Sequence, residues 1–361
     1  MKHITEYRAP GLIKSLAAEI RNRSRTPVRL MEFCGGHTAT VFKYGLRQLL
    51  PDTVEMVSGP GCPVCVTDQS DLDRALALAR IPDVILTTFG DLMRVPGSSG
   101  SLQTAAADGA DVRVVYSTLE ALALAKKNPG RPVIFIGVGF ETTAPTIAAA
   151  IIRAKTEGLS NFHALSLHKT CPPVIDALLS QGQLNLHGLI CPGHVSTITG
   201  TKAWAPLAEK HTIPCVVSGF EPADILQSVL MLVNQIESRR AEVENAYTRG
   251  CTWEGNVNAH KIMDTFFITG PAVWRGLGPV ADSGLKIRKE YAVFDAERVF
   301  DVSPPPEVSS PAGCICGDIL RGVKTPPDCP LFRSACTPSS PVGPCMVSSE
   351  GACGTYYAYS E

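Results

Sequence analysis

Short apolar segments of the kind that form buried strands alternate with helical patterns from Pro27 to about Gly270. The expected strands are residues 28–33, 83–90, 112–117, 132–140, 163–168, 187–193 and 214–220. Helical patterns such as 68–80 and 118–128 lie between them. This alternation is typical of α/β proteins, in which helices cover a largely parallel sheet of apolar strands. The sequence therefore predicts an α/β fold.

Two stretches of the sequence resemble each other and indicate a repeated unit. The segments MEFCGGHTATVF (31–42) and GLICPGHVSTIT (188–199) both place Cys-x-Gly-His directly after an apolar strand. A Val-Ser-Gly triplet follows at 57–59 and at 217–219. Motifs repeated at nearly the same separation predict two related structural units. We therefore expect two similar α/β/α domains with mainly parallel sheets, formed by residues 27–148 and 149–275.

The last part of the chain differs in composition from the α/β region. Residues 303–313 read as a turn-rich linker, and residues 314–361 carry six of the 13 cysteines. So short a segment buries little apolar area and needs a covalent or metal staple. Clustered thiolates suit an iron–sulfur cluster or tetrahedral zinc, and the paired C-x₂₋₄-C knuckles of zinc modules are missing. We expect a small iron–sulfur domain formed by residues 1–26 and 276–361, with structural zinc as the alternative.

Charge and hydropathy exclude several classes of protein. The chain carries 33 Lys and Arg against 34 Asp and Glu, which argues against non-specific binding to nucleic acid. No apolar run reaches the roughly 18 residues of a membrane span, and the first residues lack the apolar core of a secretory signal. We therefore expect a cytoplasmic protein, in which clustered thiols bind metal or do redox work more often than they form structural disulfides.

Cys62 and Cys65 form a C-x-x-C motif between an expected strand and a helix that begins near Asp68. This spacing brings two sulfurs within bonding range and commonly lowers the pKa of one thiol. The positive end of the helix dipole also favours thiolate. The motif therefore predicts a redox-active pair. The alternative is half of a zinc site, which Cys34 and His37 could complete.

Cys34 and His37 follow the first expected strand at its carboxyl end, where open α/β sheets bind ligands. The two glycines between them let a ligand approach the backbone closely. A thiolate and an imidazole can together bind a metal, or act as nucleophile and base. Glu141 follows the strand at 132–140 and is a candidate general acid or base, although it could instead cap the next helix.

Other cysteines and one histidine lack such a context. Cys171, Cys215 and Cys251 have no partner at a ligand-like spacing. His194 belongs to the second Cys-x-Gly-His copy, in which a stiffening proline follows the cysteine. We expect these four residues to be structural.

Together these motifs resemble the HypD family of nickel–iron hydrogenase maturation factors. The matching segments span nearly the whole chain: MEFCGGHT (31–38), SGPGCPVCVT (58–67), TFGDLMRVPGS (88–98), GFETTAP (139–145), CPGHVSTITG (191–200) and the cysteine-rich tail (314–353). The combination is specific, although no single motif is. The resemblance implies a scaffold that assembles an Fe(CN)₂CO group, with a HypC-type chaperone as heterodimer partner and a HypE-type protein as cyanide donor.

The resemblance also implies roles for individual residues. Cys34 would hold iron that carries cyanide and CO, jointly with a cysteine of the HypC-type partner, and His37 would lie beside it. Cys62 and Cys65 would be the redox pair near this iron. Four tail cysteines would ligate a 4Fe–4S cluster, and two would form a relay disulfide like that of ferredoxin–thioredoxin reductases. We assign the cluster to Cys314, Cys329, Cys336 and Cys353, and the relay to Cys316 and Cys345.

Two other classes of function fit part of this pattern. One is a thiol–disulfide oxidoreductase that acts on protein substrates, with Cys34 merely structural. The other is a zinc-stapled interaction protein without redox function. Whether an assembly scaffold counts as an enzyme is partly a matter of definition, because its product leaves with a partner.

Overall fold

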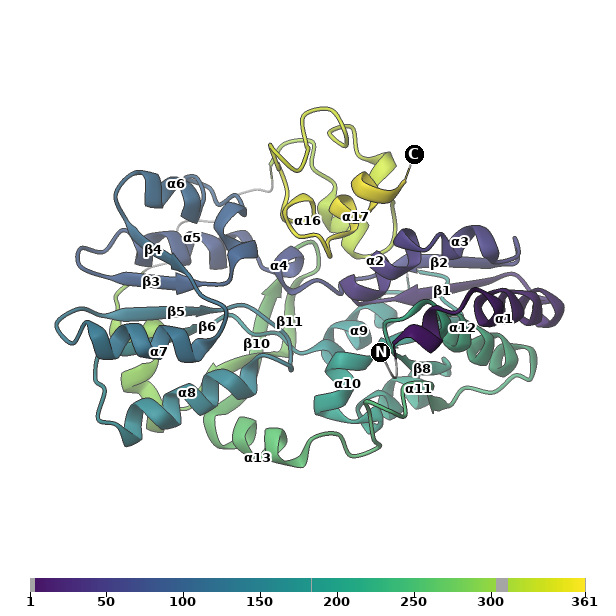
Figure 1. Cartoon of the computed structure of the whole chain (residues 1–361), viewed down its shortest axis with the longest axis horizontal. Coiled ribbons are helices and arrows are strands. Elements are labelled where there is room, and N and C mark those ends of the chain that lie inside the picture. Colours follow the sequence, from purple (N-terminus) through teal and green to yellow (C-terminus); the bar gives the residue numbers. More distant parts are fainter. Residues whose placement is uncertain (1–3, 183, 303–310, 361) are drawn as a thin grey trace.

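The computed structural model describes residues 4–182, 184–302 and 311–360, which form two α/β lobes with a cysteine-rich segment packed over their junction (Figure 1). The sheet of the first lobe has the order β2-β1-β7-β8-β9, and that of the second has the order β4-β3-β5-β6. All neighbouring strands in both sheets are parallel. The expected fold class, two α/β units with mainly parallel sheets and a cysteine-rich end, is confirmed.

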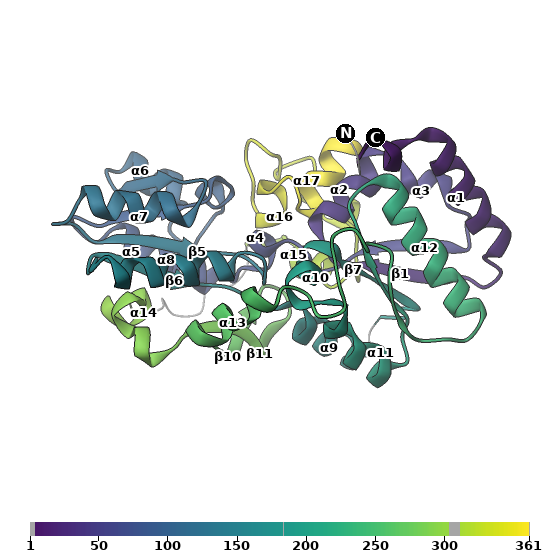
Figure 2. The ribbon, with the colours of Figure 1, turned by 60° about the horizontal axis from the view of Figure 1, so that its bottom comes forward.

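Every strand expected from the sequence is present, with slightly shorter bounds. The first sheet contains β1 (Val28–Glu32), β2 (Val54–Ser58), β7 (Gly188–Pro192), β8 (Cys215–Ser218) and β9 (Val243–Asn245). The second contains β3 (Ile85–Thr88), β4 (Asp111–Val114), β5 (Val133–Gly137) and β6 (Phe162–Ser166). A two-stranded antiparallel hairpin, β10 (Phe267–Trp274) and β11 (Gly278–Ile287), lies between the lobes (Figures 1 and 2).

The helices divide among the same three parts of the molecule. Those of the first lobe are η1 (Thr5–Arg8), α1 (Pro10–Arg23), α2 (Gly35–Lys43), α3 (Leu46–Leu49), α9 (Cys171–Ser180), α10 (Gly193–Thr199), η3 (Thr201–Trp204), α11 (Ala205–His211) and α12 (Pro222–Glu237). Those of the second lobe are α5 (Gln69–Ala79), η2 (Gly90–Arg94), α6 (Leu102–Ala107), α7 (Thr118–Lys127), α8 (Ala144–Thr156), η4 (Lys289–Phe294) and α14 (Ala296–Val299). Between the lobes and in the tail are α4 (Pro63–Val66), α13 (Val257–Phe266), α15 (Cys316–Leu320), η5 (Pro326–Asp328), α16 (Pro344–Val347) and α17 (Ala352–Tyr359).

Local signals in the sequence set several helix starts. The Asp68 side chain accepts the Ser70 N–H at the start of α5, and the Ser117 hydroxyl accepts the Glu120 N–H at the start of α7. These caps satisfy amide groups that would otherwise have no partner. Both helices expected from the sequence are confirmed. Across the described residues, no helix combines the length and the apolar composition that crossing a membrane requires.

The direction in which successive strands are added to the first sheet reverses between β1 and β7. Ile190 of β7 belongs to the apolar cluster formed with α3 and α12, whereas the adjacent Leu189 belongs to the cluster formed with α11. Because alternate residues of a strand point to opposite faces, α3 and α11 cover opposite faces of the sheet. Helices that follow two neighbouring strands on opposite faces leave a crevice at the carboxyl ends of those strands. Figure 1 shows α2 and α3 above this sheet, with α9 to α11 below it.

The chain does not complete one lobe before it starts the next. The two Cys-x-Gly-His copies follow β1 and β7, which pair with each other in a single sheet. The repeat therefore relates two halves of one sheet across the crevice, and the sheets do not follow the expected ranges 27–148 and 149–275. The expected grouping of 1–26 and 276–361 also differs from the packing, because α1 packs on α12 and β11 pairs with β10.

Candidate functional site

The two copies of the Cys-x-Gly-His motif meet in the crevice between β1 and β7. Cys34 follows β1 and is buried, and its Sγ lies 3.4 Å from Nδ1 of His194, the histidine of the second copy. His37 lies in the first turn of α2 and is fully buried. The Phe220 ring packs against both imidazoles, at centroid distances of 5.1 Å to His37 and 5.6 Å to His194. The Cys34 thiol and the His194 imidazole therefore meet at this edge of the sheet, and the His37 ring packs on the same Phe220 side chain.

Burial determines the charge state of these groups. Desolvation lowers the pKa of His37 to about 3 and that of His194 to about 4, so both rings are neutral at pH 7. Neither nitrogen of His37 has a hydrogen-bond partner, although the Ser218 and Gly219 backbone lies nearby. Neutral imidazoles with a free nitrogen are the form that binds metal. The expectation that His194 is purely structural does not match this placement, and the repeat itself was the signal that could have revealed it.

The Cys34 sulfur is a thiol in the folded chain. Desolvation raises the pKa of Cys34, and the nearby Glu350 and Glu32 raise it further. The Glu32 carboxyl accepts the Cys34 N–H at 3.1 Å and the Thr38 hydroxyl at 2.5 Å. Burial raises the pKa of Glu32 to about 7. A cation bound at Cys34 would stabilise both ionised groups, so metal binding here is coupled to proton release.

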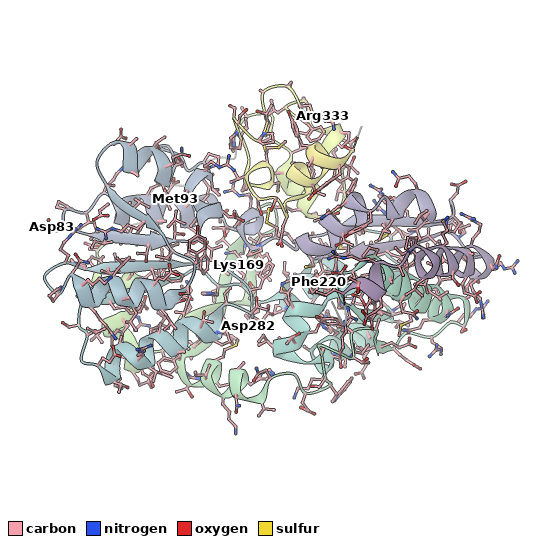
Figure 3. All side chains as sticks on the ribbon, in the orientation of Figure 1. Asp83, Met93, Lys169, Phe220, Asp282 and Arg333 are labelled. Carbon is pink, nitrogen blue, oxygen red and sulfur yellow. A yellow bond between two sulfur atoms is a disulfide. The ribbon has the colours of Figure 1, made fainter. Side chains whose placement is uncertain are left out.

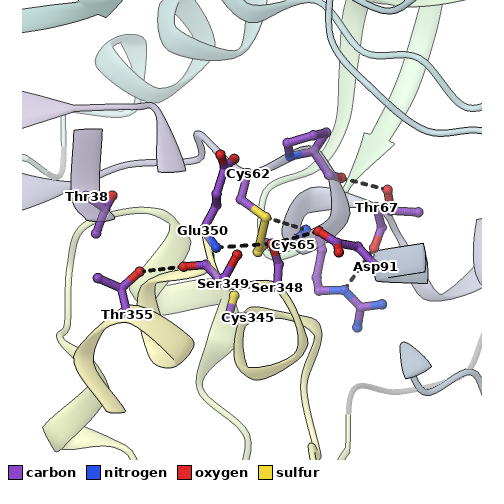
Figure 4. The surroundings of a disulfide bond; sticks show 12 residues. Thr38, Cys62, Cys65, Thr67, Asp91, Cys345, Ser348, Ser349, Glu350 and Thr355 are labelled. Carbon is purple, nitrogen blue, oxygen red and sulfur yellow. Dashed lines mark hydrogen bonds between the residues drawn. A yellow bond between two sulfur atoms is a disulfide. The ribbon is translucent and has the colours of Figure 1, made fainter. Parts of the chain in front are cut away.

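The C-x-x-C motif is fixed directly beside Cys34. Cys62 and Cys65 form a disulfide at the start of α4 (Figure 4). The Gly35 N–H donates to the Gly61 carbonyl at 3.2 Å, and a Cβ on Gly61 would lie 2.1 Å from the Phe33 carbonyl carbon. Only glycine permits so close an approach of two backbones. The disulfide and the Cys34 loop are therefore held side by side.

Arg275 holds the far end of the C-x-x-C segment, and no motif in the sequence marked it. This buried residue lies in the turn of the β10–β11 hairpin. Its Nε donates to the Thr67 carbonyl at 2.9 Å, its two terminal nitrogens donate to Gln69 Oε1, and its own N–H donates to the Val66 carbonyl. At the same turn, Gly276 packs directly on the Gly317 backbone. The hairpin therefore connects α4 to the tail.

Glu141 is buried and contacts the start of α9. Its Oε1 accepts the N–H of Cys171, the first residue of α9, at 2.7 Å, so it does not cap the next helix, α8. Its other carboxylate oxygen is buried without a partner, and burial raises its pKa to about 7. Burial also raises the pKa of Cys171, with further contributions from Glu141 and Cys34. Cys171, expected to have no role, is thus an electrostatic neighbour of the site.

The six tail cysteines line one small cavity. They share it with apolar side chains: Ile319, Leu331, Phe332 and Met346. Within the cavity the sulfurs of Cys316 and Cys345 are 3.0 Å apart, a hydrogen-bond contact and not a covalent bond. Hydrogen bonds from Cys314 and Cys345 lower the pKa of Cys316. Cys316 is therefore the more acidic thiol of the Cys316–Cys345 pair.

The cavity abuts the disulfide. Helix α16, which carries Cys345, packs on α4, and Figure 4 shows Cys345 beside Cys62 and Cys65. The Ser348 hydroxyl also donates to Asp91 of the second lobe at 3.4 Å. Thiols of the tail are therefore brought next to the disulfide of the front half of the chain.

The arrangement of the donor side chains suits a cluster better than a single metal ion. Within the described residues, no three His, Cys, Asp or Glu side chains converge closely enough to hold one ion. Both zinc alternatives, in the tail and at Cys34–His37–Cys62–Cys65, therefore lack a preformed tetrahedral set. A cubane cluster spreads its four thiolates more widely than one ion does, and six cysteines around an apolar cavity fit that requirement.

Comparison with known proteins identifies the family. The model of the family described as HypD, hydrogenase formation hypA family, matches residues 11–360. The chain belongs to the HypD family. The hydrogenase maturation factor HypD of Rhizobium leguminosarum bv. viciae is 48% identical over 370 aligned residues, covering 99% of this chain and 96% of that protein. The HypD proteins of Azotobacter vinelandii and Escherichia coli K12 are 47% and 44% identical, over 99% and 100% of this chain. The resemblance found in the sequence motifs is thus confirmed.

Proposed function

We propose that this HypD-family chain is a cytoplasmic scaffold on which an iron carrying cyanide and CO is assembled for a hydrogenase. The observation that supports it most is the contact of Cys34 with His194, with His37 packed on the same Phe220 ring, beside the Cys62–Cys65 disulfide. Its relatives are named hydrogenase maturation factors. The disulfide supplies redox equivalents next to a site with the ligands that soft iron prefers.

Cys34 is the proposed protein ligand of the incoming iron. Low-spin iron bearing cyanide and CO favours thiolate, and the neutral His194 ring 3.4 Å from the sulfur is in the form that can bind the metal. Glu141, with a pKa of about 7 and a free oxygen, can give or take a proton nearby. A cysteine of a HypC-type chaperone would complete the iron site in a heterodimer, and a HypE-type protein would deliver cyanide.

Cys316 and Cys345 are the proposed relay to the Cys62–Cys65 disulfide. Hydrogen bonds with Cys316 and Cys353, together with burial, raise the pKa of Cys345, so Cys345 attacks the disulfide as its proton passes to the more acidic Cys316. A mixed disulfide forms, and one of Cys62 and Cys65 leaves as a thiolate that takes up this proton from Cys316. Cys316, with its lowered pKa, then attacks Cys345 and releases the second thiolate. The Cys316–Cys345 bond forms as the Cys62–Cys65 bond breaks, so two electrons move towards the iron site. The remaining tail cysteines, Cys314, Cys329, Cys336 and Cys353, would hold a 4Fe–4S cluster, which supplies single electrons when bound.

The burial of the disulfide disfavours the oxidoreductase alternative. Cys62 is 4% exposed and Cys65 is fully buried. A thiol that exchanges with protein substrates must be reached by them, and catalytic cysteines are typically partly exposed. The tail already occupies the neighbouring surface through the α16–α4 contact. The disulfide is therefore placed for exchange within the chain.

Infrared spectroscopy tests this function directly. The chain would be purified anaerobically with a HypC-type partner as wild type, Cys34→Ala and Cys251→Ala, the last being another buried cysteine, whose sulfur donates to the Ser196 carbonyl. We expect cyanide and CO stretching bands in the wild type and in Cys251→Ala, and none in Cys34→Ala. Bands of undiminished intensity in Cys34→Ala would contradict the assignment of the iron ligand.

A further inference from the structure

Cys34 cannot react with anything in the folded chain unless a cover moves. The Cys34 side chain is 1% exposed, the His37 ring beside it is fully buried, and His194 is half-buried. The Phe220 ring lies over both imidazoles, and it packs so closely on Gly36 that a Cβ there would be 3.1 Å from the ring and 3.7 Å from the Cys34 sulfur. Phe220 and the Cys34 sulfur thus occupy the same side of Gly36.

The outer side of Phe220 faces a surface pocket. Its lining consists of Ile4, Phe220, Glu221, Tyr247 and Arg249. Phe220 is only half-buried, since its inner face covers the histidines and its outer face lines this pocket. The Tyr247 ring meets Phe220 edge-on at 6.1 Å. The Phe220 ring therefore lies between this pocket and the histidines beside Cys34.

The N-terminal segment fastens this cover from outside. The Arg8 guanidinium forms a bidentate ion pair with Glu221, the residue after Phe220, and its Nη2 lies 2.8 Å from Glu221 Oε1. The Tyr7 ring stacks on Arg249, whose centre lies 3.8 Å from the ring centroid. Figure 3 shows Phe220 at the inner end of the first lobe, close to this segment. The segment η1 therefore contacts residues on both sides of the pocket.

We infer that Phe220 is the gate between solvent and Cys34, that the pocket outside it is the entrance, and that the Arg8–Glu221 pair latches the gate. Rotation of one half-buried ring opens the path without any change in the sheet. The latch is exposed, so its contribution is modest, whereas the aromatic contacts of Phe220 contribute most of the closure. The inference concerns access to the thiol and does not depend on what Cys34 binds.

The competing route to Cys34 passes Glu350 of the tail. A Cβ on Gly35 would lie 2.5 Å from the Glu350 Cβ, so this side chain covers the Cys34 loop from the direction of the disulfide. If the thiol were reached from there, removal of the Glu350 side chain would expose it and removal of the Phe220 ring would not. The two routes therefore predict opposite results for two single substitutions.

Alkylation of the full-length native protein by iodoacetamide, read by peptide mass spectrometry, tests the gate. Trypsin releases Cys34 in residues 30–43 and Cys215 in residues 211–239, each as the only cysteine of its peptide. Cys215 lies in the sheet core and reports general loosening of the fold. The variants are Phe220→Ala, Phe220→Leu, Arg8→Gln and Glu350→Ala. Arg153→Gln, which breaks the exposed Arg153–Glu157 pair of the second lobe, is the control for Arg8→Gln.

We expect Phe220→Ala to speed alkylation of Cys34 about tenfold or more, since each aromatic contact contributes up to about a factor of ten to an opening equilibrium. Phe220→Leu should give a smaller increase, and Arg8→Gln an increase of about two- to fivefold. Glu350→Ala should give only the small increase that follows from removing a carboxylate that raises the Cys34 pKa, and Arg153→Gln should leave the rate unchanged. The inference would be overturned if the alkylation rate of Cys34 were unchanged in Phe220→Ala, or if Glu350→Ala had a larger effect than Phe220→Ala. It would also be overturned if Cys215 showed the same increase as Cys34 in every variant.

Discussion

The buried carboxyl of Glu141 should make stability depend on pH in a defined direction. Burial raises its pKa from 4.5 to about 7, so in this interval the folded chain keeps a proton that the unfolded chain releases. Its contribution is greatest at low pH, falls as the pH rises through the interval, and levels off above pH 7. A shift of this size corresponds to roughly 3 kcal/mol.

Glu141→Gln isolates this contribution. Glutamine resembles the protonated carboxyl and still accepts the Cys171 N–H, but it does not titrate. The free energy of unfolding of Glu141→Gln, minus that of the wild type, should therefore rise by roughly 3 kcal/mol between pH 5 and pH 8. Glu32 titrates in the same range, but its contribution is common to both proteins and cancels in the difference.

Urea unfolding at four pH values between 5 and 8, under anaerobic conditions, measures this difference. The control is Glu157→Gln, an exposed carboxyl paired with Lys126 and Arg153, whose pKa these partners lower. It stays ionised throughout this range, so its difference from the wild type should not change with pH. If the Glu141→Gln difference were the same at pH 5 and pH 8, Glu141 would not be a buried carboxyl of raised pKa, and its role in proton transfer would be lost.

Three further substitutions test the site. Gly61→Ala should lower the free energy of unfolding in urea by about 1–3 kcal/mol, because its Cβ would clash with the Phe33 backbone. The control Gly130→Ala, whose Cβ would have nothing within 4 Å, should change it by less than about 0.5 kcal/mol. Equal losses in the two variants would contradict the close approach. Arg275→Gln should lower the free energy of unfolding, measured in the same way, by about 3 kcal/mol, because it leaves the Thr67 carbonyl without its donor. No change would show that the hairpin does not anchor α4. His194→Gln should weaken the cyanide and CO infrared bands about tenfold or more, and full intensity would make this histidine structural after all.

Patterns within single segments predicted the local structure well. Apolar runs gave all seven expected strands, because a strand buried on both faces needs consecutive apolar residues wherever it lies in the sheet. Cysteine spacing likewise pointed to the C-x-x-C pair and to the tail cavity. These features depend on residues that are close together in the sequence.

The order of the strands was not predictable from such patterns. Nothing in the composition of β1 indicates that its neighbour is β7 and not a strand from the next segment, so the repeat was interpreted as two domains. That one misassignment also hid His194, which reaches Cys34 only because the two copies are adjacent. Arg275 acts through contacts with a distant segment and lies in no motif of its own. Phe220 directly follows the second Val-Ser-Gly triplet, but nothing local in the sequence shows that its ring packs on His37 and His194.

The central claim is that the thiols of the tail reach and reduce the disulfide beside Cys34. Cys316→Ser tests it most directly, because without the resolving thiol the attack of Cys345 should stop at the mixed disulfide. After anaerobic reduction of the whole protein and mild reoxidation, non-reducing tryptic maps should then show residues 48–74 linked to residues 334–361 through Cys345 and one of Cys62 and Cys65. The link should be absent when Cys345 is also replaced by serine. If Cys316→Ser alone gave no such link, while Cys62 and Cys65 still cycled between disulfide and dithiol, the proposed relay would be contradicted.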